Sequence, residues 1–224
     1  KKNEIGPLQK EKESASFLQG FRDMKEGFQY LQERLDASRG IIATAVQRGG
    51  LTALTLTALL LERNTFNDPS KPEAGLQGFG IALSIAGIGL FLGAFLAPYG
   101  VARFGRHRWI KFAMIASACS PLILAAMQTE IGLSVTAFLT AFFGQNIKVT
   151  NDALVQSKVD DYHRGRVFAV YDVVVNGAIV SGGLIAALLL PPSGLSRIVP
   201  LAVSAAYLLI AFIVLRPAKF YATY

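Results

Sequence analysis

The 224 residues contain one cysteine, two histidines and few charged side chains. The single cysteine, Cys119, excludes a disulfide framework and a metal site built from several cysteines. The two histidines, His107 and His163, do not supply enough ligands for a zinc centre by themselves. Charged residues make up 17% of the chain, whereas a soluble domain carries about 25%. This low charge argues against a soluble globular enzyme.

The sequence motifs of nucleotide-dependent and hydrolytic enzymes are also missing. There is no Walker A loop, so the chain does not contain an ATP-hydrolysing domain of the P-loop kind. The glycines of Gly87–Gly93 are one residue too widely spaced for a dinucleotide fingerprint, and they lie inside an apolar run. No paired carboxylates and no Ser/His/Asp or Cys/His set falls where an active site would need it. We expect no enzymatic activity, no cofactor and no metal.

Long apolar runs are the main feature that is present, with 52% hydrophobic residues and a mean hydropathy of +0.42. A transmembrane helix needs about 20 largely apolar residues. Backbone groups in lipid must satisfy their own hydrogen bonds, so such runs are helices. We predict an all-α membrane protein in which residues 40–216 form one bundle of six transmembrane helices. The predicted spans are Ile41–Leu61, Phe79–Val101, Trp109–Met127, Ile131–Val149, Val167–Leu190 and Ile198–Leu215.

The segments outside the bundle are predicted to be a linker with an amphipathic helix, residues 1–39, and a tail, residues 217–224. Apolar residues from Phe17 to Leu35 recur at alternating spacings of four and three, on one face of a helix capped by Ser14 or Ser16. This helix either packs on its own protein or lies in the membrane interface. Because the chain begins with Lys1 and shows no signal peptide, we expect it to belong to a longer protein.

The basic residues orient the predicted spans. With the amino-terminal segment in the cytoplasm, nine basic residues fall on the cytoplasmic side and three on the opposite side. The nine are Arg103, Arg106, Arg108, Lys111, Lys158, Arg164, Arg166, Arg216 and Lys219, and the three are Arg63, Lys71 and Arg197. Both ends of the chain are therefore expected in the cytoplasm. The net charge of +7 is attributed to topology and anionic lipid contact, and no nucleic-acid partner is expected.

Polar residues inside the predicted spans are candidates for a substrate pathway, because charges at membrane depth usually face a cavity or a partner. Gln47 and Arg48 lie in the first span, and Arg48 either reaches back to the interface or contacts an anionic or polar substrate. Asp172 and Asn176 share a face of the fifth span. Asp172 either couples proton movement or pairs with a nearby cation. Asn146 either bonds another helix or lines the pathway. The cations near Asp172 are Arg164, Arg166 and Lys148.

Small residues allow membrane helices to approach closely, and the chain has 21 glycines. The second span has a small-xxx-small pair, and the fifth span has a similar cluster. The glycines predicted to pack helices are Gly89, Gly93, Gly177, Gly182 and Gly183. Among the aromatic residues, Tyr207 in the last span is expected to face lipid.

Three loop segments carry a family resemblance: Arg103–Arg108 has the pattern Arg-x-Gly-Arg-x-Arg, Asp160–Phe168 contains Arg-Gly-Arg-Val, and Glu26–Leu31 reads Glu-Gly-Phe-Gln-Tyr-Leu. The three segments occur in a fixed order relative to the six predicted spans. In sequence and in this order they resemble loops of the major facilitator superfamily of transporters. The resemblance covers nearly the whole chain from about Phe17. Ala102 stands where the first-half version of the basic loop carries an Asp, which indicates the carboxy-terminal half.

The resemblance implies a gating role for charged residues near the cytoplasmic helix ends, which would form and break ion pairs during alternating access. The alternative is that the basic loops only fix orientation. The residues concerned are Arg103, Arg106, Arg108, Asp160, Asp161, Arg164 and Arg166.

The expected function is that of half of a secondary active transporter, with ion-coupled export of a small-molecule substrate in a bacterial plasma membrane. The expected partners are the lipid bilayer and an amino-terminal six-helix half, on the same polypeptide or on a separate chain. A second hypothesis is a non-transporting membrane subunit that scaffolds or regulates a larger complex. Transport by the complete protein distinguishes the two hypotheses.

Overall fold

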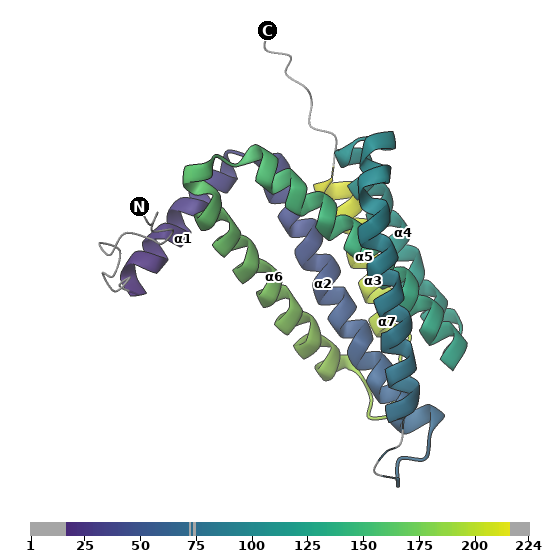
Figure 1. Cartoon of the computed structure of the whole chain (residues 1–224). Coiled ribbons are helices and arrows are strands. Elements are labelled where there is room, and N and C mark those ends of the chain that lie inside the picture. Colours follow the sequence, from purple (N-terminus) through teal and green to yellow (C-terminus); the bar gives the residue numbers. More distant parts are fainter. Residues whose placement is uncertain (1–16, 72, 74, 216–224) are drawn as a thin grey trace, which may run out of the picture.

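The computed structural model describes residues 17–71, 73 and 75–215, and every regular element in them is helical (Figure 1). The long helices are α1 (Phe17–Gln32), α2 (Leu35–Leu61), α3 (Leu76–Phe104), α4 (Arg106–Ala126), α5 (Glu130–Lys158), α6 (Asp161–Leu189) and α7 (Ile198–Leu209). A π-helical turn extends α2 as η2 (Glu62–Phe66), and another extends α7 as η3 (Ile210–Val214). Ser14, Ser16 and the predicted tail lie outside the described residues.

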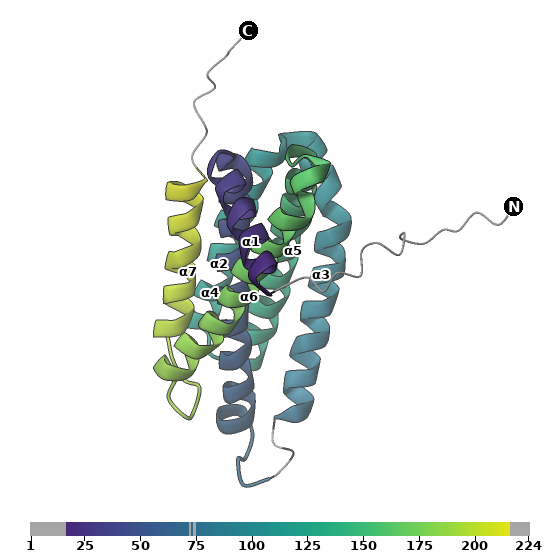
Figure 2. The ribbon, with the colours of Figure 1, turned by 90° about the vertical axis from the view of Figure 1, so that its left-hand side faces the viewer.

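Helices α2 to α7 form a bundle of two layers (Figures 1 and 2). In Figure 1 the front layer shows α6, α2, α5 and α3 side by side, with α6 packed on α2, α2 on α5 and α5 on α3. Behind it, α4 packs on α5, and α7 packs on α4 and α2. Helix α1 lies outside the bundle against the first turns of α6. Among the described helices, the front layer is therefore covered on one side only.

Three of the described helices, α3, α4 and α6, are long and apolar enough to cross a membrane. The apolar helix Ile198–Val214 is shorter, and α2 and α5 carry the polar residues described below. Only 6% of the most apolar stretch of α6 is buried, which suits a helix surrounded by lipid or by another bundle. The prediction of an all-helical fold is confirmed, and three of the six predicted spans have the length and composition of a span.

Helix packing in the bundle relies on glycines that bring backbones together. A Cβ atom on Gly89 or Gly93 of α3 would collide with carbonyl oxygens of α5. A Cβ atom on Gly182 of α6 would collide with the carbonyl oxygen of Gly49 on α2. Gly183 has only ordinary contact space beside α2, and Gly177 has no described atom within 4 Å of its Cβ position. Gly89, Gly93 and Gly182 thus lie in tight contacts, whereas Gly177 points away from the described helices.

Helix boundaries differ from the predicted ones where polar sequence continues a helix. Helix α5 runs nine residues past the predicted end of its span at Val149 and reaches Lys158. Polar residues at a helix end are hydrated outside the bilayer, so the apolar pattern stops before the helix does. Leu35 was expected on the amphipathic helix, but α1 ends at Gln32 and Leu35 begins α2 with 58% exposure. Spacing alone did not detect the break at Glu33 and Arg34.

Tyr207 does not face lipid, and that prediction is wrong. Its side chain is fully buried, and its hydroxyl donates a 2.8 Å hydrogen bond to the carbonyl oxygen of Gln47. The ring occupies the space that a Cβ atom on Gly50 would need. A phenol at membrane depth gains from an internal acceptor, and Gly50 leaves room for the ring to reach it.

Substitution of Gly182 tests the α2–α6 contact. In Gly182→Ala the new methyl group meets the Gly49 backbone, so we expect a loss of about 1–3 kcal/mol, typical of overpacking. Gly177→Ala on the same helix is the matched control, and its better helix propensity predicts unchanged or slightly higher stability. Thermal unfolding of the purified protein in detergent measures both variants. Equal unfolding temperatures would contradict a tight α2–α6 contact.

Candidate functional site

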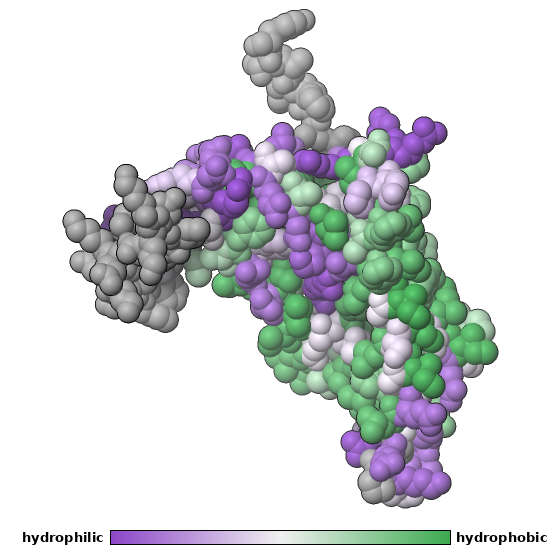
Figure 3. All heavy atoms as spheres, in the orientation of Figure 1, coloured by the Kyte–Doolittle hydropathy of each residue, from purple (hydrophilic) through white to green (hydrophobic). Residues whose placement is uncertain are grey.

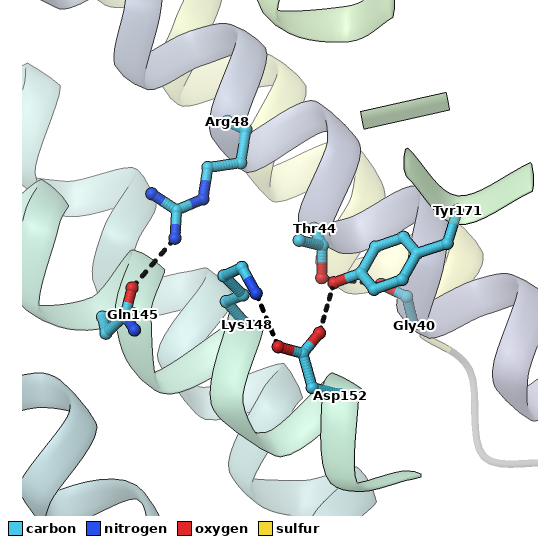
Figure 4. A network of polar contacts seen from close by, with 7 residues as sticks. All are labelled: Gly40, Thr44, Arg48, Gln145, Lys148, Asp152 and Tyr171. Carbon is cyan, nitrogen blue, oxygen red and sulfur yellow. Dashed lines mark hydrogen bonds and ion pairs between the residues drawn. The ribbon is translucent and has the colours of Figure 1, made fainter. Parts of the chain in front are cut away.

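Hydrophilic side chains gather in the middle of the front layer, between α6 and α3, where the surrounding surface is mostly apolar (Figure 3). We call the residues at its centre the polar network: Arg48 and Thr44 on α2, Gln145, Lys148 and Asp152 on α5, and Tyr171 on α6 (Figure 4). Three neighbouring helices of one layer thus direct polar side chains toward one another. Such a group inside an apolar bundle is the expected signature of a functional site.

Two sets of contacts make up the polar network. Arg48 donates a 2.9 Å hydrogen bond from Nη2 to Oε1 of Gln145. Lys148 forms an ion pair with Asp152 one turn further along α5, and the second oxygen of Asp152 accepts a 2.8 Å bond from the Tyr171 hydroxyl. Figure 4 shows these contacts side by side, joining α2 to α5 and α5 to α6.

The charged side chains of the polar network are partly exposed at the surface of the front layer. The side chains of Lys148 and Asp152 are 39% and 27% exposed, and Arg48 and Gln145 are half-buried. Because charged hydrogen bonds strengthen as water is excluded, closing the front of the layer would strengthen the Lys148–Asp152 pair. In the described part of the chain, no three His, Cys, Asp or Glu side chains gather as a metal site would require.

Gln47 and Asn146, two predicted pathway residues, lie inside the bundle. Gln47 is fully buried between α2 and α5 and donates a 3.2 Å bond to the carbonyl oxygen of Thr140. Asn146 is fully buried where α3 meets α5 and donates to the carbonyl oxygen of Phe142. The structure therefore brings Arg48, but neither of these residues, into the polar network.

Asp172 and Asn176 are exposed on α6, one turn apart. The amide of Asn176 donates a 2.8 Å bond to the backbone oxygen of Asp172. The Asp172 carboxylate forms no ion pair within the described residues. Lys148, Arg164 and Arg166, the cations considered as its partners, pair instead with other acids. The interpretation of Asp172 as a structural ion-pair partner is therefore wrong.

Sequence reasoning missed Asp152 and Tyr171. Asp152 lies three residues beyond the predicted end of its span at Val149, so it was counted with the loop. The Lys148–Asp152 spacing of four residues was a usable signal, because such a pair meets on one face of a helix. Tyr171 adjoins Asp172, but nothing in a single sequence reports that its hydroxyl reaches a carboxylate on α5.

A second charged cluster joins α1 to the start of α6. Arg166 forms ion pairs with Asp23 at 3.1 Å and Glu26 at 2.9 Å. The backbone of Gly27 rests on that of Arg166, where a Cβ atom would collide with the Arg166 carbonyl oxygen. Two of the three resembling segments, Glu26–Leu31 and Asp160–Phe168, are therefore in direct contact.

Aromatic and polar contacts extend this cluster. The Tyr30 ring stacks on His163 with centroids 4.3 Å apart, and its hydroxyl donates a 2.9 Å bond to Asp160. Arg34 lies 3.6 Å from the same carboxylate. Arg164 pairs with Asp161 within its own helix. These contacts hold α1 on its own protein, as the first of the two interpretations of the amphipathic helix expected.

The basic loop between α3 and α4 is a single-residue turn at Gly105, whose φ of 78° lies in the left-handed region that glycine tolerates. Arg106 donates a 2.6 Å bond to the Ser157 hydroxyl on α5. Within the described residues, Arg103, Arg106 and Arg108 form no ion pair, so acids on neighbouring described loops do not hold them. Their predicted gating role stays a prediction.

At the opposite end of the bundle, a carboxyl group is buried beyond the predicted end of the first span. Glu62 begins η2, is 2% exposed and packs against Gly78 of α3. Its Oε2 atom has no hydrogen-bond partner among the described residues. Burial raises the pKa of the Glu62 carboxyl, and the nearby charge of Glu130 raises it further. The folded protein therefore binds a proton at this carboxyl more tightly than the unfolded chain does.

Substitution of Arg166 tests the contact between α1 and α6. Each ion pair at the surface adds a small stabilisation, so we expect Arg166→Gln, which removes two of them, to reduce the hydrogen-exchange protection of α1 several-fold. The loss should shrink as salt is added, because salt already weakens these pairs in the unaltered protein. Arg164→Gln, which removes a pair inside α6, is the matched control. Equal protection of α1 in both variants would contradict the role given to Arg166.

Substitution of Glu62 tests the buried carboxyl. A raised pKa means that the folded state binds a proton more tightly than the unfolded state. The resulting stabilisation is complete below the ordinary pKa of 4.5 and is lost as the pH rises through the raised value. We expect thermal stability to fall from acidic to neutral pH, and Glu62→Gln to flatten this dependence. Glu73→Gln in the exposed loop should leave the profile unchanged; a profile that Glu62→Gln does not alter would exclude Glu62 as its source.

Comparison with known proteins identifies the family. Residues 40–220 match the family model described as Major Facilitator Superfamily. Uncharacterized MFS-type transporters of Mycobacterium tuberculosis and Mycobacterium bovis are each 30% identical over 169 residues, which is 75% of this chain. The match covers 37% of the length of these relatives. This chain belongs to the major facilitator superfamily, a family of integral membrane transporters and not of enzymes.

Proposed function

We propose that this chain is the carboxy-terminal six-helix half of a secondary active transporter that exports a small molecule by alternating access with ion coupling. The observation that carries the proposal is the polar network on a layer covered on one side only. An apolar bundle has no structural need for Arg48, Lys148 and Asp152 at that position. Those residues suit a surface that faces a water-filled pathway and a second bundle.

The proposed partner of the front layer is an amino-terminal six-helix half, on the same polypeptide or on a separate chain. Transporters of this kind bind substrate near the middle of the membrane, between two halves that rock against each other. The match to relatives of which this chain covers 37% supports a second half of similar size. The proposed location is a bacterial plasma membrane, with both ends of the chain in the cytoplasm.

The proposed coupling group is a carboxylate on the front layer. Asp152 is held by Lys148 and Tyr171, and Asp172 stands exposed on α6 without an ion-pair partner among the described residues. Protonation of Asp152 would remove the negative charge that pairs with Lys148. The Lys148–Asp152 ion pair would then weaken when Asp152 carries a proton. This links a proton to the contact between α5 and α6.

Proteoliposomes containing the full-length transporter test the proposal. They enclose a pH-sensitive dye, an acid gradient is imposed, and small-molecule fractions of a bacterial extract are added from outside. We expect at least one fraction to cause protein-dependent proton movement. Asp152→Asn should abolish most of that signal, whereas Asp68→Asn in the exposed loop should preserve it.

Two outcomes would contradict the proposal. If no fraction moves protons or accumulates, the non-transporting scaffold hypothesis gains and the transporter proposal fails. If transport proceeds equally in Asp152→Asn, Asp152 is not the coupling group although transport itself stands.

A further inference from the structure

The charges of the polar network do not balance. Arg48 and Lys148 are cations and Asp152 is the one acid of the network, which leaves one net positive charge. Lys148 and Tyr171 already engage both oxygens of Asp152. Arg48 contacts only the neutral amide of Gln145, and within the described residues it has no ion-pair partner. The unbalanced charge is therefore that of Arg48.

The guanidinium of Arg48 is suited to an anion. It is planar, remains charged and offers five N–H donors in a fork that matches a carboxylate or phosphate. One donor is used by Gln145, which directs the group toward α5 (Figure 4). An isolated cation at membrane depth is unfavourable unless an anion or water meets it. The remaining donors are thus available to a negatively charged group that enters from the front.

An apolar cleft begins about one helical turn from Arg48, at Leu51 of α2. Its volume is about 40 Å³, and it is lined by α2, α3 and α5 and by Leu124 of α4. Leu51 and Thr55 follow Arg48 by three and seven residues, so they lie on the same face of α2. The first of them is about 4.5 Å further along the helix axis.

The cleft offers an apolar surface in spite of three threonines. The hydroxyl of Thr55 donates to the backbone of its own helix, and that of Thr136 donates to the Ser120 carbonyl oxygen. The Thr140 hydroxyl bonds the Ser120 hydroxyl. With these groups engaged, the cleft can hold an alkyl group or the edge of a ring and gains little from a polar one.

We propose that the front layer binds a small amphiphilic organic anion, with its carboxylate or phosphate on Arg48 and its apolar part in the cleft between α2, α3 and α5. This rests on the proposed transport function and adds the substrate class. Asp152 lies beyond Lys148 and repels a second negative charge, so the anion occupies the Gln145 side of Arg48. The same chemistry is found in soluble acids and in lipid headgroups, which the experiment separates.

Binding to the full-length transporter in phosphatidylcholine nanodiscs tests the proposal, with hexanoate, acetate, 1-hexanol and hexylammonium as probes. Hexanoate carries both features, and each other probe lacks or inverts one. We expect hexanoate to bind at least about tenfold more tightly than the others, measured by calorimetry. Arg48→Gln should weaken hexanoate about tenfold and leave 1-hexanol unchanged. Arg63→Gln, at an exposed position of η2, is the matched control.

A substitution that fills the cleft tests whether the apolar part of the ligand binds there. Ala86→Leu on α3 fills the cleft, so it should weaken hexanoate toward the affinity of acetate. Ser84→Leu adds the same side chain at an exposed position of α3 outside the cleft and should have no effect. Thermal unfolding of each variant confirms that it is folded before binding is compared.

Several results would overturn the proposal. They are a preference for hexylammonium, the absence of binding by all four probes, and an Arg48→Gln variant with unchanged hexanoate affinity, which would show that an acid of the other half neutralises Arg48. Loss of hexanoate binding when phosphatidylglycerol is added would assign the site to lipid headgroups and not to substrate. In each case, proton-coupled movement of some other compound in the proteoliposome experiment would leave the transport function standing.

Discussion

Direct contact between helix backbones is the constraint on which this bundle depends. In lipid, helices gain little from burying apolar side chains against each other, since the surrounding acyl chains are equally apolar. Stability must come from close packing, and close packing requires positions without a Cβ atom. Gly89 and Gly93 provide them between α3 and α5, and Gly49 and Gly182 provide them between α2 and α6. These contacts set the spacing of α3 from α5 and of α2 from α6 in the front layer.

The same spacing decides where polar groups can be placed. At the centre of the layer, α2, α5 and α6 are close enough for Arg48 to reach Gln145 and for Tyr171 to reach Asp152. Toward the rear layer the space is filled, for example by Tyr207 beside Gly50 and by Gln47 beside Gly144. Gln47 and Arg48 are neighbours in the sequence, yet their side chains have different roles. Gln47 forms a hydrogen bond inside the bundle, whereas Arg48 is partly exposed at the front layer.

The sequence predicted the all-helical fold, and it singled out Arg48, which lies in the polar network. Apolar runs longer than a bilayer needs have no alternative to helices, so the number and order of helices followed directly. The loop segments predicted the family, which the comparisons confirm. Gly89 and Gly93 were also placed in a packing role by their spacing, and both lie in tight contacts in the structure.

Other features depended on rotation about helix axes and on contacts between distant segments, which one sequence does not report. Gly177 and Gly182 look equivalent in the sequence, yet only Gly182 meets another helix. Asn146 and Lys148 are two residues apart on α5, so one points into the bundle and the other toward the front. The partners of Arg166 lie more than 130 residues away on α1, and no local pattern indicates them.

The contacts of α1 make one end of α6 different from the other. Only the short link between Gln32 and Leu35 separates α1 from α2, and α1 also grips the first turns of α6. Near its start, α6 therefore contacts both α1 and α2, which also contact each other. Three mutual contacts restrict the movement of this end of α6. Beyond Gly182, Leu184 and Leu188 are 60% and 77% exposed, whereas Ala186 is buried in the bundle core. Helix α6 is consequently held by charged contacts to α1 at its start and by small-residue contacts to the bundle near its end.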